Sequence, residues 1–440
     1  MRSTALTSAI LAIVLSLPAG ALAKHVVNGS QSHTYRRQPN RLTLSVNIAG
    51  TVPRFQGANG AEIPRAGATA NDMRVTTKTQ VYSAIKRLVP GARVVATHAS
   101  IAPTQLRQDN GERVDVWRSN QSITITAPRS KQANVDHLRD ALSRIDGVVN
   151  VGSTSSSLSD GRYRSARNGA EVQAVKKLKK RADKAAPGAQ LTQLSLGSAS
   201  LGSPQPYARS MSLESAAAPA ESHFGQNAVS ASVSGTWQRG GVRPQERRLT
   251  LSANAVAKSK PDLGGIVLSN SSQAPTKAAA VEAHNAKWAR VNQLVRQHLG
   301  AGFKTVGDSS MTASDARSGY PATASQSWTI NNVKLTGGGD SKLYALRQAL
   351  AEENIAVQLT SGITAGRYNK ALAGVQKTVA RRAAGRASNA AKAAGANLDL
   401  NRDIGLPNVG NEDNLRAASQ NRFDVPIQIQ GSGSFGFGIR

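Results

Sequence analysis

The chain of 440 residues contains no cysteine. A disulfide framework, a thiolate nucleophile and a cysteine-ligated zinc or iron–sulfur site are therefore excluded. Aromatic residues are scarce, with 4 Trp, 7 Tyr and 6 Phe, so the cores must rest mainly on Ala, Val, Leu and Ile. Acidic residues are also few: 26 Asp and Glu stand against 55 Lys and Arg, a net charge of +29. Such a charge either serves solubility or attracts polyanions.

Long hydrophobic runs are absent, and the one short run lies at the N-terminus. Residues 9–17 (AILAIVLSL) follow the basic Arg2 and precede Ala21-Leu22-Ala23. This pattern is typical of a secretory signal peptide, and the run is too short to span a bilayer, which takes about 20 residues. We expect cleavage after Ala23, no transmembrane span, and a protein of the periplasm or the outer-membrane periphery. The positive charge then points to anionic envelope polymers or lipids rather than to chromosomal DNA.

The remaining sequence indicates a tandem repeat of one domain. Five short matches recur in the same order with an offset of about 207 residues: Arg41–Ser45 with Arg248–Ser252, Gln121-Ser122 with Gln326-Ser327, Leu138–Leu142 with Leu346–Leu350, Gly161–Tyr163 with Gly366–Tyr368, and Gly188–Leu191 with Gly395–Leu398. Glycines and a proline mark a boundary between them. We predict a signal peptide over 1–23, a first domain over 24–238, a linker over 239–247 and a second domain over 248–440.

Each half has the pattern of an α+β unit. In the first half, apolar and polar residues alternate as in a strand over 41–50, and helical spacing covers 69–89. Further strands are indicated at 94–101, 114–125 and 148–151, and a helix capped by Ser130 precedes the last of them. This order is that of a ferredoxin-like unit. We predict two similar domains, each a mainly antiparallel sheet with helices packed on one face.

A long helix with a stripe of small residues follows in each half. The stripe repeats every four residues: Ala166, Ala170, Ala174, Leu178, Ala182 and Ala186, and then Ala371, Val375, Val379, Ala383, Ala387 and Ala391. Small side chains would let this helix lie close to a sheet or to a partner helix. A pair of strands then closes each half, near 190–195 with 229–237 and near 397–400 with 425–430.

Several of these segments together resemble a known family. They are the signal peptide, Asn285 within AHNAKWARVNQLV, the small-residue helix after Gly-Arg-Tyr, residues 188–198 (GAQLTQLSLGS), 206–211 (PYARSM), 229–237 (VSASVSGTW) and 427–431 (IQIQG). The pattern is similar to the SIMPL-domain family of bacterial periplasmic and outer-membrane-associated proteins, here as a tandem pair. The resemblance implies an α+β fold, an envelope location, homo-oligomers, a role in envelope or stress physiology, and neither an enzyme activity nor a cofactor.

Catalytic and metal-binding motifs are weak. The seven histidines show no metal-ligand spacing, so no metal site is predicted. Ser83 and Lys86 match S-x-x-K without its companion motifs, and a hydrolase acting through Ser83 remains only a third hypothesis. Residues 431–436 match G-x-G-x-x-G, but no helix follows to bind a pyrophosphate. We predict no catalytic residues.

The basic face of the long helix is the one candidate binding site. Its members are Lys176, Lys177, Lys179, Lys180, Arg181 and Lys184 in the first half, and Lys377, Arg381, Arg382 and Arg386 in the second. Such a face binds polyanions by counterion release, and the lack of aromatic neighbours argues against sequence-specific recognition of nucleic acid. The alternative is a solvated helix face. We predict a non-enzymatic, self-associating envelope scaffold or binding protein, or else a binder of lipopolysaccharide, anionic lipid or extracellular nucleic acid.

Overall fold

The computed structural model describes residues 25–56, 61–107, 111–202, 226–240, 247–303, 306–307, 311–316, 321–399 and 423–440. The predicted signal peptide (1–23), the 206–211 segment and most of the predicted linker (239–247) lie outside these ranges. Within them, no helix is both long enough and apolar enough to cross a membrane.

The same series of elements occurs twice. The first half, residues 25–240, contains β1 (His25–Arg37), β2 (Arg41–Pro53), α1 (Ala66–Leu88), β3 (Arg93–Ala96), β4 (Ser100–Arg107), β5 (Arg113–Pro128), a 3₁₀ turn (Arg129–Lys131), α2 (Gln132–Leu142), β6 (Val148–Val151), β7 (Ser155–Ser157), α3 (Asp160–Ala185), β8 (Gln190–Gly202) and β9 (Asn227–Arg239). The second half, residues 247–440, contains β10 (Arg248–Ser259), β11 (Leu263–Ala274), α4 (Lys277–Leu299), β12 (Val306–Gly307), β13 (Thr312–Ser314), β14 (Ala322–Lys334), α5 (Gly339–Glu352), β15 (Ala356–Gly362), α6 (Ala365–Ala393), β16 (Leu398–Asp399) and β17 (Ile427–Ile439).

Sheet B contains the ferredoxin-like part of both halves. Its strands run in the order β12-β14-β11-β15-β4-β5-β2-β6, and all its pairings are antiparallel. The first half contributes β4-β5-β2-β6 with α1 packed on α2 and β2, so the predicted topology is confirmed there. The alternation over 41–50 has its expected cause, because Leu42, Leu44, Val46 and Ile48 are buried in the core.

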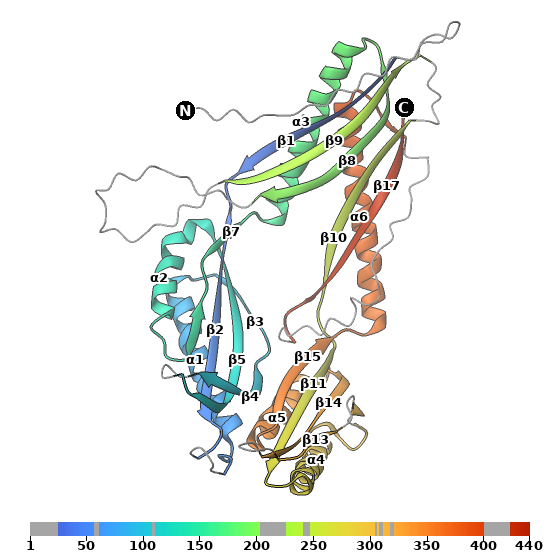
Figure 1. Ribbon diagram of the computed structural model, residues 1–440. Helices are drawn as coiled ribbons and strands as arrows, with labels where there is room; N and C mark the ends of the chain where they lie inside the picture. Colours follow the sequence, from blue (N-terminus) through green and yellow to red (C-terminus); the bar gives the residue numbers. More distant parts are fainter. Residues whose placement is uncertain are drawn as a thin grey trace, which may run out of the picture.

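Sheet A lies at the top of the molecule in Figure 1, and sheet B lies at the bottom. Its order is β1-β9-β8-β10-β17-β16. Helix α3 packs on β1 and β9, and α6 packs on β10 and β17. The small-residue stripe is the reason these helices fit. Five of its six positions on α6 are buried, and so are its five positions on α3 and Ala186, which follows α3 directly. One core formed by α3, α6 and the sheet contains residues from both halves.

A pair of equivalent corners connects the two sheets. Pro39-Asn40 leads from β1 to β2, and Pro261-Asp262 leads from β10 to β11. Asn40 Oδ1 accepts a hydrogen bond from Ser159 N at 2.8 Å, and Asp262 Oδ1 accepts one from Thr364 N at 2.8 Å. Ser159 and Thr364 are the N-cap residues of α3 and α6, so each corner fixes the start of one long helix.

Three sequence-based expectations need correction. The match of 41–45 with 248–252 is fortuitous, because Arg41 begins β2 in sheet B whereas Arg248 begins β10 in sheet A, where β1 is its equivalent. Ser130 does not cap a helix; α2 begins after Lys131 without a side-chain cap. The glycine-rich segment 431–436 is part of β17, paired with β10, and extends the closing strand to Ile439.

Candidate functional site at the junction of the halves

The two halves are joined at both sheets. In sheet B, β4 pairs with β15 through Ser100 and Ile101. In sheet A, residues 193–196 of β8 pair in parallel with residues 248–251 of β10. Both sheets therefore run continuously from one half into the other. Several of the buried polar side chains lie along this junction, among them Asn71, Arg74, Glu171, Asn354 and Arg386.

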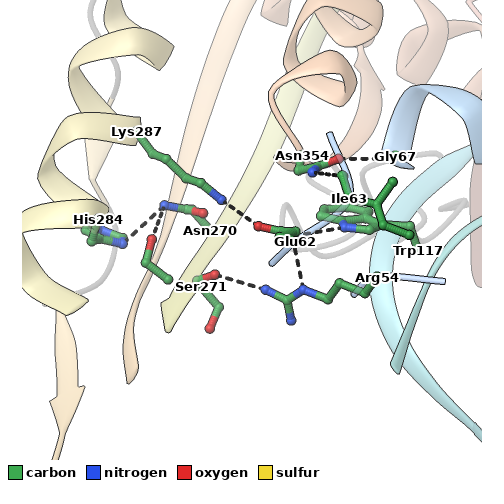
Figure 2. Close-up of polar contacts among 11 residues, drawn as sticks. Arg54, Glu62, Ile63, Gly67, Trp117, Asn270, Ser271, His284, Lys287 and Asn354 are labelled. Carbon is green, nitrogen blue, oxygen red and sulfur yellow. Dashed lines mark hydrogen bonds and ion pairs between the residues drawn. The ribbon is translucent and has the colours of Figure 1, made fainter. Parts of the chain in front are cut away.

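Helix α1 is capped by a residue of the opposite half. Its own N-cap, Arg65, offers no side-chain hydrogen bond. Instead, Asn354 Oδ1 accepts from Gly67 N at 3.0 Å, and Asn354 Nδ2 donates to Ile63 O at 2.9 Å (Figure 2). Asn354 has a φ of 53°, a left-handed conformation that asparagine tolerates better than most residues. The start of α1 thus depends on the second half.

Glu62 is the centre of a charged cluster across the same junction (Figure 2). Its Oε1 accepts from Arg54 Nε at 3.1 Å and from Trp117 Nε1 at 3.2 Å, and its Oε2 accepts from Lys287 Nζ of the second half at 3.2 Å. Burial alone would raise the pKa of Glu62, but the charges of Lys287 and Arg54, with these hydrogen bonds, bring the pKa below its ordinary value. The carboxylate therefore stays ionised and links the halves.

Arg74 on α1 is a buried cation held by neutral groups. It donates to Asn71 Oδ1, Ser119 Oγ and Gln121 Oε1. Burial, and then the nearby charge of Arg347, lower the pKa of Arg74 to about 10. Asn71 also donates to Gln348 of the second half at 2.9 Å, so this network is part of the junction too.

The upper junction is centred on Glu171 of α3. Arg386 of α6 donates to both of its carboxylate oxygens, from Nη2 at 2.6 Å and from Nε at 3.0 Å. Arg167 Nε donates to Glu171 Oε1 at 2.9 Å. Glu171 and Arg386 are only 2% and 7% exposed. Such a bidentate, buried pair fixes α3 against α6.

A cavity of about 510 Å³ opens beside this ion pair. It lies between the first turns of α3, the second half of α6 and the middle of β10. Its lining is Asp160, Tyr163, Arg164, Arg167, Asn168, Ala253, Asn254, Ala255, Val256, Arg382, Gly385, Arg386 and Asn389. Four guanidinium groups therefore surround one opening.

The structure places the residues of the predicted cationic face in different environments, some exposed and some buried. Lys176, Lys177, Lys180, Arg181 and Lys184 are exposed on α3, and Lys377 and Arg381 are exposed on α6. Lys179 is half-buried and pairs with Asp183 at 2.6 Å. Arg382 is half-buried and donates to Asn254 O at 2.9 Å. The prediction was wrong for Arg386, which is buried in the pair with Glu171 and cannot belong to a solvated face.

Sequence reasoning missed Arg164, Arg167, Asn168 and Asn389, which line the cavity with Arg382 and Arg386. The run Arg162 to Arg167, with three arginines in six residues, was the available signal. Ser83 and Lys86 are exposed on α1, and Ile85 between them is buried in the core. In the part of the chain that the structure describes, no three His, Asp or Glu side chains are grouped as a metal site would need.

The fold and the junction define an α+β protein in which a ferredoxin-like unit and a strand–helix–strand layer each occur twice, joined edge to edge. Residues 62–237 match the model of the SIMPL family, which is described as a protein of unknown function (DUF541). The matched range begins at Glu62 and ends at Trp237 in β9, so it leaves out β1 and β2. The family model detects no second copy in the chain. No curated protein matches the chain.

Proposed function

We propose that this protein is an exported, non-enzymatic scaffold or binding protein of the cell envelope that self-associates head to tail. The second half is then a divergent SIMPL-like domain. The run 9–17 and the Ala21-Leu22-Ala23 site support export. The observation that carries the proposal is that, among the described residues, each half has strand edges on its outer side, away from the other half.

The internal junction joins unlike edges. The first half contributes β8 and β4, and the second half contributes β10 and β15. By element order, β16 and β13 of the second half are equivalent to β8 and β4, while β1 and β6 of the first half are equivalent to β10 and β15. Among the described residues, β1 and β16 are the outer strands of sheet A, and the outer edges of sheet B are formed by β12 with β13 and by β6 with β7. The outer edges of the second half in one copy can therefore pair with the outer edges of the first half in the next copy, as the two halves pair within one chain.

A contact between unlike surfaces can be repeated by further copies, giving a ring or a filament. Exposed apolar residues lie on or beside these edges: Val26 on β1 is 49% exposed, Val149 on β6 is 54% exposed, and Met311 lies beside β13. Unpaired edges with apolar side chains are typical sites of strand addition.

Contacts between copies would be weaker than the internal junction. The segment 54–65, which carries Glu62 and Ile63, has only Pro275 and Thr276 in its place between β11 and α4. Thr276 caps α4 by accepting from Ala279 N at 3.2 Å, so α4 does not require a cap from another half. We therefore expect association that depends on concentration.

The test is the mass of residues 24–440 in solution, measured by analytical ultracentrifugation over a range of concentrations. We expect species larger than the monomer that increase with concentration. The double variant Val26→Lys, Val149→Lys should shift the protein toward monomer, because two charges are placed on the outer edges.

The matched control is Val75→Lys, which changes an exposed valine on α1 away from both edges. It should associate like the wild type. A strict monomer at micromolar concentration, or equal dissociation in the control, would contradict the proposal.

The second candidate function is binding of polyanions by the exposed lysines of α3. Lys176, Lys177, Lys180, Arg181 and Lys184 face solvent, and Asp183, paired with Lys179, is the acid among them. Affinity for lipopolysaccharide should then fall steeply with salt. Replacing Lys176, Lys177 and Lys180 by Gln should weaken binding and flatten the salt dependence; unchanged binding would remove this helix as the site.

A further inference from the structure

The cavity between α3, α6 and β10 has an excess of positive charge. Four arginines lie at it, Arg164, Arg167, Arg382 and Arg386. Asp160 also lines it, and the buried carboxylate of Glu171 lies directly behind. Four cations against two carboxylates leave two positive charges in excess.

Arg164 and Arg382 are the two arginines of the cavity that Glu171 does not bind. Glu171 engages Arg167 and Arg386 and holds them at the base of the cavity. Arg164 Nε donates to the backbone oxygen of Asp160 at 3.0 Å, and Arg382 Nη1 donates to Asn254 O at 2.9 Å. Within the described residues, neither pairs with a carboxylate at ion-pair distance.

These two guanidinium groups are close enough to affect each other. Burial, and then the charge of Arg164, lower the pKa of Arg382, while Asp160 acts in the opposite direction. Two like charges that share a partly desolvated opening repel each other. A dianion between them would remove this repulsion and accept hydrogen bonds from both forks.

The rest of the cavity suits an organic group attached to that anion. Tyr163, with Ala253, Ala255 and Val256, supplies aromatic and aliphatic surface. The amides of Asn168 and Asn389 and the carboxylate of Asp160 can bond hydroxyl groups. The volume of about 510 Å³ is in the usual range of small-molecule sites.

We propose that this cavity binds a phosphomonoester with a hydroxylated organic part, its phosphoryl group between Arg164 and Arg382. The organic part lies along Tyr163 and β10. The phosphoryl group is favoured over a single carboxylate because it carries a charge of about −2 near neutral pH and has three acceptor oxygens. The site does not depend on self-association, since all its residues come from one chain.

The test uses two probes, because a phosphomonoester can be a free metabolite or a lipid headgroup. Calorimetric titration with glycerol 3-phosphate tests the free compound, with glycerol as the uncharged control. Sedimentation with phosphatidylcholine vesicles, with and without phosphatidic acid, tests the headgroup. We expect saturable binding of at least one phosphorylated probe.

The decisive variants are Arg164→Gln with Arg382→Gln, compared with Arg162→Gln and Arg381→Gln. Each pair removes two positive charges at neighbouring positions, but Arg162 and Arg381 do not line the cavity. We expect a tenfold or greater loss of affinity in the first pair and less than a twofold change in the second. Circular dichroism melting confirms that both pairs fold.

The outcomes separate cleanly. Binding of glycerol 3-phosphate with this variant pattern supports a free ligand, and binding of phosphatidic acid vesicles alone, with the same pattern, supports a lipid headgroup. Equal loss in both variant pairs, or no saturable binding of either probe in the millimolar range, would overturn the site. Affinity should also rise from pH 5 to pH 7.5 as the phosphomonoester becomes a dianion, with a second pKa of about 6; a flat profile would contradict the pairing with two arginines.

Discussion

At the scale of single residues, the carboxylate of Glu171 links α3 to α6 at the upper junction. Glu171 lies on α3, and the arginine that grips it bidentately lies 215 residues further along the chain. On sequence alone, Arg386 counts as one more cation on a basic helix. Only the parallel packing of α3 on α6 buries it, because the small-residue stripe lets the two helices approach each other.

Replacing Glu171 by Gln should destabilise the protein strongly. Two buried or half-buried guanidiniums would lose their counter-charge, and breaking a buried pair in this way costs about 3–5 kcal/mol. Urea unfolding measures the loss. The control is Asp183→Asn on the same helix, whose carboxylate pairs with Lys179 at the surface and should matter by less than about 1 kcal/mol. Equal effects of the two substitutions would show that the Glu171 pair does not hold the helices.

The Glu62 cluster should make the junction sensitive to acid. In the folded state the pKa of Glu62 is below its ordinary value of 4.5. The ionised carboxylate therefore stabilises the fold fully above pH 4.5, and this stabilisation is lost as the pH falls through the folded pKa. Wild type and Glu62→Gln should therefore differ in free energy of unfolding at pH 7 and converge in strong acid. Urea midpoints measured from pH 7 to pH 3 check this. A difference that stayed constant over that range would mean that ionisation of Glu62 is not what matters.

At the scale of elements, periodic patterns predicted most of what the structure contains. The strand over 41–50, the helix over 69–89 and the long striped helices were visible because apolar or small residues recur along them with the period of a strand or a helix. On the helix over 69–89, however, Val75 is 43% exposed and the neighbouring Arg74 is buried. The corners at Pro39-Asn40 and Pro261-Asp262 were not recognised, although they are the true equivalents. Each corner has a proline followed by a polar residue whose side chain accepts a hydrogen bond at the start of a long helix. Short sequence identity, such as that of 41–45 with 248–252, does not indicate a shared structural role of this kind.

A single glycine sets the distance of α1 from sheet B. A Cβ at Gly50 of β2 would lie 1.9 Å from Ala70 O and 2.7 Å from Arg74 N, both backbone atoms of α1. Gly50→Ala should force the helix outward and destabilise the protein by about 1–3 kcal/mol or more.

The matched control is Gly374→Ala on α6, where an added Cβ meets no atom within 4 Å. In an exposed helix interior, alanine should stabilise by up to about 1 kcal/mol. Thermal melting of both variants gives the comparison. A neutral Gly50→Ala would show that α1 can shift without loss.

At the scale of the whole molecule, the halves share two continuous sheets and two of the hydrophobic cores. Sheet A and sheet B each cross from first half to second, and the α3–α6 core draws on both. The sequence pointed to two domains joined by a linker. The tertiary structure adds that the start of α1 is capped by the second half. It also adds that each half supplies strand edges with which the other half pairs.

Cutting the chain between the halves should therefore not separate them. After cleavage at a protease site introduced into residues 241–246, between β9 and β10, the two fragments should elute together in size-exclusion chromatography. The sheet pairings, the Glu171–Arg386 pair and the Asn354 cap remain intact after the cut. Elution in urea, where the fragments should separate, confirms complete cleavage. Separate elution without urea would contradict a junction of this strength.

The sequence by itself determined the α+β class, the repeated order of elements and the stripes that bury α3 and α6, since these depend on local periodicity and composition. It also determined the excess of positive charge. Only the tertiary structure decided which cations face solvent and which form the cavity, because that depends on contacts between α3 and α6 over more than 200 residues of sequence. The junction was hidden for the same reason: hydrogen bonds between strand edges involve the backbone, which every residue type shares.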